Sequence, residues 1–266
     1  MALLPFYSFS QQVADTTYNP KIKHPLYAFG QGPVVFIDEG HHNFHTKEGR
    51  YKAFSNLLER DGYHVKAYSG QFKEKQLAEG KILVISNALN AINVRDWTLP
   101  NPSAFTKAEI ASITQWVHSG GRLFLIADHM PMAGAAKDLA MAFGFEFTNG
   151  FAMDTIHKGP AYFNMKDKTL SKNSITKGRN TNESVEQIVS FTGQAFKIPN
   201  DATPILTFNK NFVNMLPNKA WVFDEKTTKY NVEGWSQGAY KTYGKGKIVV
   251  FSNAFYEIFF MRFVKR

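Results

Sequence analysis

The 266-residue chain has no cysteine, no long hydrophobic run and no block of charge of one sign. The missing cysteine excludes disulfides, thiolate metal ligands and a cysteine nucleophile, and it leaves the redox compartment open. No stretch reaches the ~18 to 20 apolar residues that a membrane-spanning helix needs. Internal repeats and low-complexity segments are missing too. We therefore expect one globular domain with elaborations.

Aromatic and basic residues are abundant. The chain is 44% hydrophobic and 15% aromatic, which is typical of a well-packed globular protein. Its net charge of +9 comes from lysines spread along the chain, so it should attract anionic partners such as acidic polysaccharides and surfaces. No helix carries a basic recognition face, and we expect no specific nucleic-acid binding. We expect the partner to be a small-molecule or carbohydrate ligand, and the positive net charge would favour an anionic one. The oligomeric state stays open.

Residues 1–33 read as a segment separate from the domain at 34–266. The apolar residues 2–10, followed by Gln11 and Gln12, resemble the end of a secretory signal that lacks its basic region. A truncated signal predicts a periplasmic or extracellular protein. The alternative is an apolar arm on a cytoplasmic domain. Residues 11–33 contain three prolines and read as an extended lead-in.

Hydrophobic periodicity predicts alternating strands and helices in the first half of the domain. Apolar runs predict strands at 34–38, 64–68, 82–87 and 122–128. Helical spacing predicts a helix that Thr46 caps and Gly62 ends, a short one at 73–78, one that Thr106 and Glu109 cap, and one at 134–143. This order predicts a three-layer α/β fold with an open, mostly parallel sheet.

The second half predicts antiparallel elaborations. After a strand at 146–151, residues 153–184 are polar and read as an insertion or lid. Short strands are expected at 185–189, 204–208 and 220–223, followed by a hairpin of 238–243 with 247–251 and a helix at 256–264.

Two blocks carry a family resemblance: Gly-Gly-Arg-Leu-Phe-Leu-Ile-Ala-Asp at 120–128 and Tyr-Gly-Lys-Gly-Lys-Ile-Val-Val-Phe-Ser-Asn-Ala at 243–254. With the element order, they resemble the class I glutamine amidotransferase-like (flavodoxin-like) superfamily, nearest to its bacterial DUF4350 and trehalose-utilisation-like branches. The resemblance covers roughly residues 34–152 and the final hairpin. It implies a cysteine directly after the strand at 123–127, where this chain has Asp128. The resemblance therefore implies the fold and the place of the site, and no glutaminase activity.

A dense group of ligand-type side chains follows the first strand. Imidazole and carboxylate groups suit Zn²⁺ or another divalent ion, whose bound water could attack an ester, amide or glycosidic centre with Glu39 as general base. The candidate metal ligands are Asp38, His41, His42 and His45, together with Asp128 and His129 from the fourth strand. The alternative is a polar loop in which Asp38 or Asn43 caps the next helix and the histidines bond backbone carbonyls.

A second hypothesis needs no metal. His129 would act as acid and base, oriented by Asp128 or Asp38, on a sugar bound at the carboxyl ends of the strands. Asp128 is equally suited to cap the following helix. Ligand hydrogen bonds are expected from Asn43, Asn87 and Asn253, and ring stacking from Trp97, Tyr162 or Trp235, although large aromatics are more often core residues. The segment after the first strand has one glycine and two acidic residues, Asp38 and Glu39, which argues against phosphate binding.

Together these patterns predict an exported hydrolase-type or carbohydrate-active protein with a His/Asp-rich site. The alternative is a secreted, non-catalytic binding or scaffold protein on an amidotransferase-like fold that has lost its nucleophile. Metal content, and the convergence of the His and Asp side chains, distinguish the two.

Overall fold

The computed structural model describes residues 15–253, and strands and helices alternate through its first half. This confirms the predicted α/β pattern. The elements are β1 Val34–Asp38, α1 Lys52–Arg60, β2 His64–Tyr68, α2 Glu74–Leu77, β3 Ile82–Ser86, the 3-10 turn η1 Ala91–Asn93, α3 Lys107–His118, β4 Arg122–Ile126 and α4 Met132–Met141.

The main sheet runs in the order β2-β1-β3-β4-β14-β13-β9-β5, with β10 also paired to β13. All pairs from β2 to β14 are parallel, and the pairs beyond β14 are antiparallel. The strands of this second part are β5 Glu146–Phe147, β9 Phe196–Lys197, β10 Thr203–Thr207, β13 Ser236–Tyr243 and β14 Gly246–Phe251. The predicted mostly parallel sheet with antiparallel elaborations is therefore confirmed, including the hairpin of β13 and β14.

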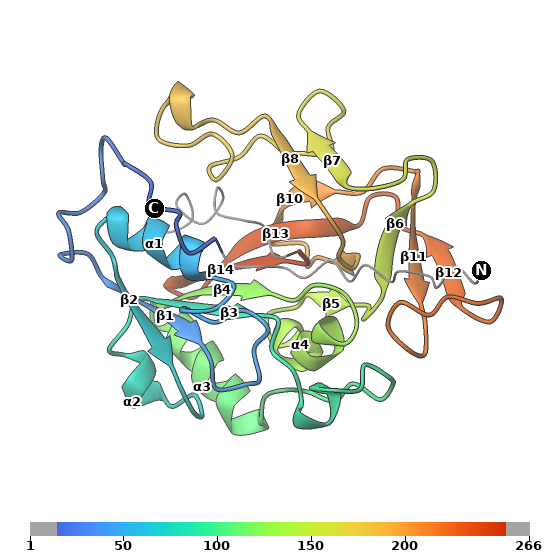
Figure 1. The fold of residues 1–266 in the computed structure, drawn as a ribbon, viewed down its shortest axis with the longest axis horizontal. Coiled ribbons are helices and arrows are strands. Elements are labelled where there is room, and N and C mark those ends of the chain that lie inside the picture. Colours follow the sequence, from blue (N-terminus) through green and yellow to red (C-terminus); the bar gives the residue numbers. More distant parts are fainter. Residues whose placement is uncertain (1–14, 254–266) are drawn as a thin grey trace, which may run out of the picture.

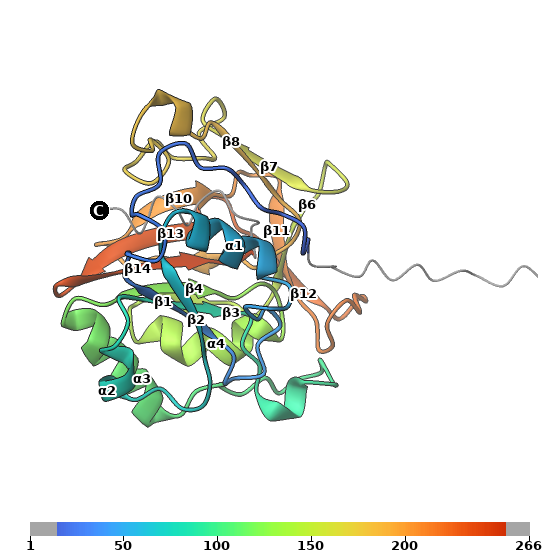
Figure 2. The same ribbon diagram turned by 60° about the vertical axis from the view of Figure 1, so that its left-hand side comes forward.

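Helices cover the two faces of the sheet unequally. α2, α3 and α4 lie on one face, and α1 lies on the other beside the strands of the second half (Figures 1 and 2). The strands between them are apolar on both faces because both are covered: every residue of β3 is buried. One core cluster joins Ile113 and Trp116 of α3 to the sheet, and the other joins Phe54 and Leu58 of α1.

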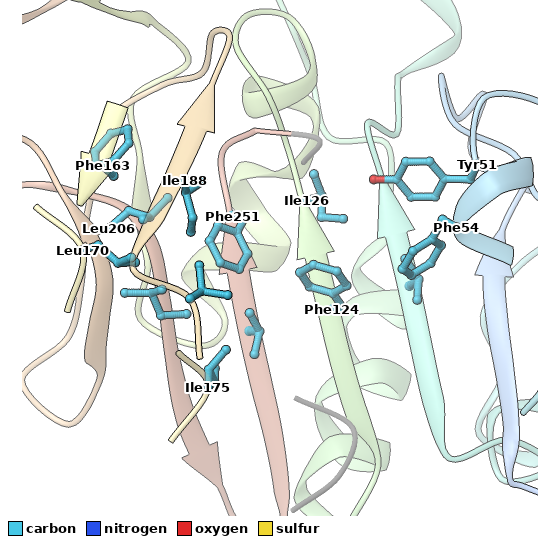
Figure 3. Close-up of a cluster of buried hydrophobic side chains, with 14 of the residues drawn as sticks. Tyr51, Phe54, Phe124, Ile126, Phe163, Leu170, Ile175, Ile188, Leu206 and Phe251 are labelled. Carbon is cyan, nitrogen blue, oxygen red and sulfur yellow. The ribbon is translucent and has the colours of Figure 1, made fainter. Parts of the chain in front are cut away.

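The second cluster extends under the strands of the second half (Figure 3). Phe124 and Phe251, from neighbouring strands, lie between Phe54 of α1 and Ile188 of β8. The elaborations are therefore part of the same hydrophobic core as the parallel sheet.

Two smaller sheets complete this side of the molecule. β12 (Thr228–Asn231), β11 (Phe212–Leu216) and β6 (Phe151–Asp154) form one, and β7 (Ala161–Asn164) pairs with β8 (Gln187–Ser190) in the other. The strand predicted at 146–151 is split between β5 and β6, and the strand predicted at 220–223 is wrong because these residues form a turn. The segment 153–184 holds the end of β6, β7 and the 3-10 turn η2 Thr181–Glu183.

The two predicted helix caps differ in outcome. Thr106 and Glu109 form the predicted capping box of α3. Thr46 does not cap α1, which begins at Lys52 after Tyr51 without a side-chain cap. The signal-like residues 2–12 lie outside the described residues, as does the helix predicted at 256–264. Within the described part of the chain, no helix combines the length and apolarity that a membrane span requires.

Candidate functional site

Four neighbouring parallel strands end side by side at one edge of the sheet. Ser86 of β3 pairs with Ile126 of β4, which pairs with Phe251 of β14, and β1 runs parallel beside β3. The loops that follow these strands therefore start at the same edge, where ligands of open α/β sheets bind. Asp38 ends β1, and the loops contain the other predicted catalytic, metal-ligating and hydrogen-bonding residues: Glu39, His41, His42, Asn43, His45, Asn87, Asp128, His129 and Asn253.

His41 lies between two carboxylates. Its Nδ1 is 2.9 Å from Oδ1 of Asp38, and its Nε2 is 2.9 Å from Oε1 of Glu109. All three side chains are buried, and the imidazole stacks on Phe72 with ring centres 4.6 Å apart. Because both ring nitrogens are engaged, His41 joins the loop after β1 to α3.

The charges of this group support one another. Burial lowers the pKa of His41, but hydrogen bonds and charge from Asp38 and Glu109 outweigh burial and raise it overall. Burial raises the pKa of Glu109, yet hydrogen bonds from Thr106, His41 and the Phe72 backbone bring it below its usual value. The contact between His41 and Glu109 thus favours the charged form of both side chains.

His45 belongs to a different contact set. Its Nδ1 lies 3.1 Å from Oγ of Ser86, which in turn donates to the Tyr51 hydroxyl at 2.9 Å. Burial, and then the nearby charge of Arg50, lower the pKa of His45 to about 3. Ser86 and His45 are both fully buried, so the pair packs the interior as a neutral unit.

The remaining residues of the first loop serve the loop itself. Asn43 donates to Oδ2 of Asp38 at 2.9 Å and accepts from the His41 backbone N–H at 3.0 Å. Glu39 accepts from the Lys47 backbone N–H at 2.7 Å, and His42 is exposed. Among residues 15–253, no group of three or more His, Asp or Glu side chains is arranged to hold a metal ion. The geometry therefore gives the metal hypothesis no support.

Asp128 lies at the centre of the edge, directly after β4. Its backbone N–H donates to Oδ1 of Asn87 at 2.9 Å, and its Oδ1 accepts from the Thr192 hydroxyl at 3.3 Å. Burial raises the pKa of Asp128, and the charge of His129 together with the hydrogen bonds from Thr192, His129 and Asn87 offsets only part of this effect. The shift is in the direction that a general acid requires.

His129 is enclosed by aromatic rings. It stacks on Phe151 with centres 4.4 Å apart and meets the edge of Trp221 at 4.7 Å, while Trp97 lies 6.1 Å away. Its Nδ1 donates to the Met130 carbonyl at 2.6 Å. In the neutral ring this bond fixes the proton on Nδ1 and leaves Nε2 as the acceptor.

Asn253 connects the end of β14 to the end of β8. Its side-chain amide donates to Oγ of Ser190 at 2.6 Å and to the backbone carbonyl of Thr192. Gln237 of β13 also donates to that carbonyl, through a long bond of 3.5 Å. Asn253 thus holds the segment that carries Thr192 against the sheet.

A pocket of about 260 Å³ opens beside this segment. Ser190, Thr192 and Gln237 form its polar wall, and Asp154 at the end of β6 and His157 in the following loop also line it. Asp154 Oδ2 lies 2.9 Å from His157 Nδ1. Burial raises the pKa of Asp154, but hydrogen bonds from His157 and two backbone N–H groups bring it below its usual value. Thr192 therefore lies between two carboxyl groups with opposite pKa shifts. It lines the pocket together with Asp154, whose pKa is lowered, and its hydroxyl donates to Asp128, whose pKa is raised.

Sequence reasoning missed most of this pocket. Thr192, Asp154 and His157 lie in segments whose patterns are weak, and no spacing rule joins them to Asp128. Gln237 carried a usable signal, since a polar residue in the otherwise buried strand β13 needs a partner. Glu109 was identified only as a helix cap. Of the predicted stacking residues, Trp97 lies near His129, Tyr162 is exposed beside the pocket-lining Ala161, and Trp235 packs on Tyr230.

Comparisons with solved structures identify the fold. The N-terminal domain of mmIFT52 is 11% identical and has a TM-score of 0.57, with 83% of this chain and 86% of that chain covered. A cytoplasmic protein from Salmonella typhimurium LT2, STM1381, is 14% identical and has a TM-score of 0.50. The match covers 87% of this chain and 92% of that chain. Searches of protein-family models and of curated proteins gave no match. The chain thus shares an α/β fold with these two proteins, built on a mostly parallel sheet with antiparallel additions.

Proposed function

We propose that the protein binds a small carbohydrate in the pocket lined by Ser190, Thr192 and Gln237. One observation carries the proposal: Oε1 of Gln237 is a buried acceptor that has no hydrogen-bond partner among residues 15–253. A buried polar atom without a partner is costly, and a ligand hydroxyl can supply the missing donor. Serine, threonine and glutamine side chains are also suited to hydrogen bonds with several hydroxyls of one sugar.

The size of the pocket supports a small ligand. At about 260 Å³ it lies just below the ~300–1,000 Å³ range of sites for drug-sized molecules. Phe191 and Phe212 supply apolar surface on which the C–H face of a sugar ring could lie. The pocket therefore favours one sugar unit over a larger cofactor.

Calorimetric titration with glucose, galactose, mannose and their common disaccharides tests the proposal. We expect the variant Gln237→Met, which keeps the volume of the side chain but loses its acceptor, to weaken sugar binding at least about ten-fold. The matched control is Gln115→Met, at an exposed position on α3. No binding of any sugar, or equal binding by Gln237→Met, would contradict the proposal.

Glycoside hydrolysis is a second candidate, favoured by the opposite pKa shifts of two carboxyls. Asp128, with its raised pKa, lies behind the pocket wall and would pass a proton to the leaving oxygen through the Thr192 hydroxyl, and Asp154, with its lowered pKa, would take a proton from the attacking water. The glycosidic C–O bond breaks as water forms the new C–O bond, and each carboxyl then exchanges its proton with solvent. Release of reducing sugar from the disaccharides that bind would test this candidate.

We also propose that the chain derives from the trehalose-utilisation-like or DUF4350 branch of its superfamily. The support is the pair of sequence blocks around Asp128 and the final hairpin, now seen as adjacent strands β4 and β14. Since Asp128 stands where the superfamily has its cysteine, the protein should release no ammonia from glutamine. A glutaminase assay that gave turnover would contradict this.

A further inference from the structure

The segment beside the pocket is strongly basic. Between residues 155 and 180 the chain has one acidic residue, Asp167, and the basic residues Lys158, Lys166, Lys168, Lys172, Lys177 and Arg179. Arg179 is paired with Glu183, whereas all five lysines are exposed and none takes part in an ion pair found among residues 15–253. The field around this part of the molecule therefore favours an anionic partner.

Lys158 belongs to the pocket itself. It lines the cavity next to His157 and opposite the polar wall of Ser190 and Thr192. Asp154 is the acidic side chain of the same lining, and it is already bonded to His157. A ligand there meets a cation at Lys158 and an ionised carboxylate at Asp154, so it needs both an anionic group and neutral hydroxyls.

Exposed aromatic rings continue the pocket along the β7–β8 sheet. Tyr162 of β7 lies opposite Val189 of β8, and these side chains are 59% and 48% exposed. Phe191, two residues beyond Val189, is 71% exposed and also lines the pocket. β7 and β8 lie at the outer side of the molecule (Figure 1), and the exposed fractions of Tyr162 and Phe191 show that both rings are open to solvent. Flat rings next to a sugar-sized pocket suit additional sugar rings.

We propose that the ligand is an anionic oligosaccharide, one unit of which occupies the pocket while its acidic group pairs with Lys158 and neighbouring units lie on Phe191 and Tyr162. This inference rests on the proposed carbohydrate binding. A sugar acid has hydroxyls for Asp154, Gln237 and Thr192 and one charge for Lys158. A nucleotide unit of a nucleic acid has fewer free hydroxyls than a sugar acid, so it would satisfy fewer of these polar groups.

The test compares two ligands with one backbone: trigalacturonate, which is anionic, and its neutral methyl ester. At low salt we expect trigalacturonate to bind about five-fold more tightly, and this preference should shrink as salt screens the pair. Lys158→Gln should remove the preference, so that acid and ester bind with about equal affinity. Lys107→Gln, which removes an exposed lysine from α3 on the opposite face of the sheet, is the matched control.

Phe191→Ala should weaken both ligands, and Phe29→Ala, at a ring that is 74% exposed, should weaken neither. A sulfated trisaccharide should also bind in a Lys158-dependent way, because Lys158 pairs with the charge of the acidic group and not with a carboxylate in particular. Equal binding of acid and ester would overturn this inference and leave the carbohydrate proposal standing, whereas binding of neither would overturn both. Tighter, Lys158-dependent binding of phosphatidylserine vesicles or of poly(U) would also overturn the inference.

Discussion

Nε2 of His41 lies 2.9 Å from Oε1 of Glu109, a contact that joins the loop after β1 to the first turn of α3, 68 residues away in the sequence. The same carboxylate accepts from the backbone N–H groups of Thr106 and Phe72. Glu109 thus caps a helix, orders a second loop and compensates a buried imidazole. Because the group is buried, its electrostatics are little screened by solvent.

Glu109→Gln should destabilise the protein by about 3–5 kcal/mol, the range for breaking a buried charge pair by removing one partner. The free energy of urea unfolding measures this loss. Glu48→Gln is the control, because Glu48 pairs with Lys47 and Lys52 at an exposed position and should change stability by less than about 1 kcal/mol. An effect of Glu109→Gln as small as that of the control would contradict the role assigned to this contact.

The pH dependence of stability gives His41 a separate signature. Its pKa is raised in the folded state, so its stabilising contribution is complete below pH 6.5 and is lost as the pH rises through the folded value. We expect wild-type stability to fall above pH 6.5 from this source. In Glu109→Gln one of the two carboxylates is gone, and the decline measured by urea unfolding from pH 6 to 9 should be shallower.

His45 should act in the opposite direction. Its pKa of about 3 means that the folded state excludes its proton, so stability is full above pH 6.5 and falls between pH 6.5 and about 3. At about 1.4 kcal/mol for each pH unit, the loss at pH 5 is about 2 kcal/mol. His45→Gln should remove this acid sensitivity, and His42→Gln, at an exposed position, should retain it. An unchanged slope in His45→Gln would contradict the prediction.

The fold could be predicted from the sequence because its signals are local. The apolar runs of β3 and β4, and the capping box at Thr106 and Glu109, depend on neighbouring residues alone, and each was predicted within a residue or two. The strands of the second half are short and half exposed, so β11 and β12 were missed and a strand at 220–223 was wrongly expected. The pairing of β11 with β6 joins segments about 60 residues apart, which no local pattern records.

The candidate site shows the same difference between features with a local sequence signal and features that depend on long-range contacts. The carboxyl edge follows from the strand order, so the positions of Asp38, Asn87 and Asp128 could be anticipated. Their partners could not, because His41 to Glu109 and Asp128 to Thr192 are contacts between side chains of distant loops. Three histidines within five residues suggested one cluster, yet the chain turns so that His41 and His45 are buried in different surroundings and His42 is exposed.

Gly246 at the start of β14 gives a prediction about packing. A methyl group there would meet the carbonyl oxygens of Val117 and Gly121, which are backbone atoms and cannot move aside easily. Gly246→Ala should therefore cost about 2–4 kcal/mol and lower the melting temperature. Gly234→Ala is the control: it has open space around it and a φ of +81°, so only the backbone conformation, about 1 kcal/mol, is at stake. Equal losses in the two variants would contradict the steric argument.

Asp128→Asn separates a catalytic role of this residue from a structural one. If Asp128 donates the proton in glycoside hydrolysis, the variant should lose about 10²–10⁴-fold in kcat and still bind sugar, since Oδ1 can accept from Thr192 as before. Wild-type activity should also fall as the pH rises through the raised pKa of Asp128.

Stability supplies the control for this variant. The raised pKa means that the folded state favours the protonated carboxyl, so its contribution is full below about pH 3.8 and is lost as the pH rises through the folded value. Asparagine has no charge to bury, and Asp128→Asn should equal or exceed the wild type in melting temperature at pH 7, with a difference that shrinks toward pH 4. A variant that loses activity and stability together at pH 7 would show that Asp128 holds the edge of the sheet rather than a proton for the substrate.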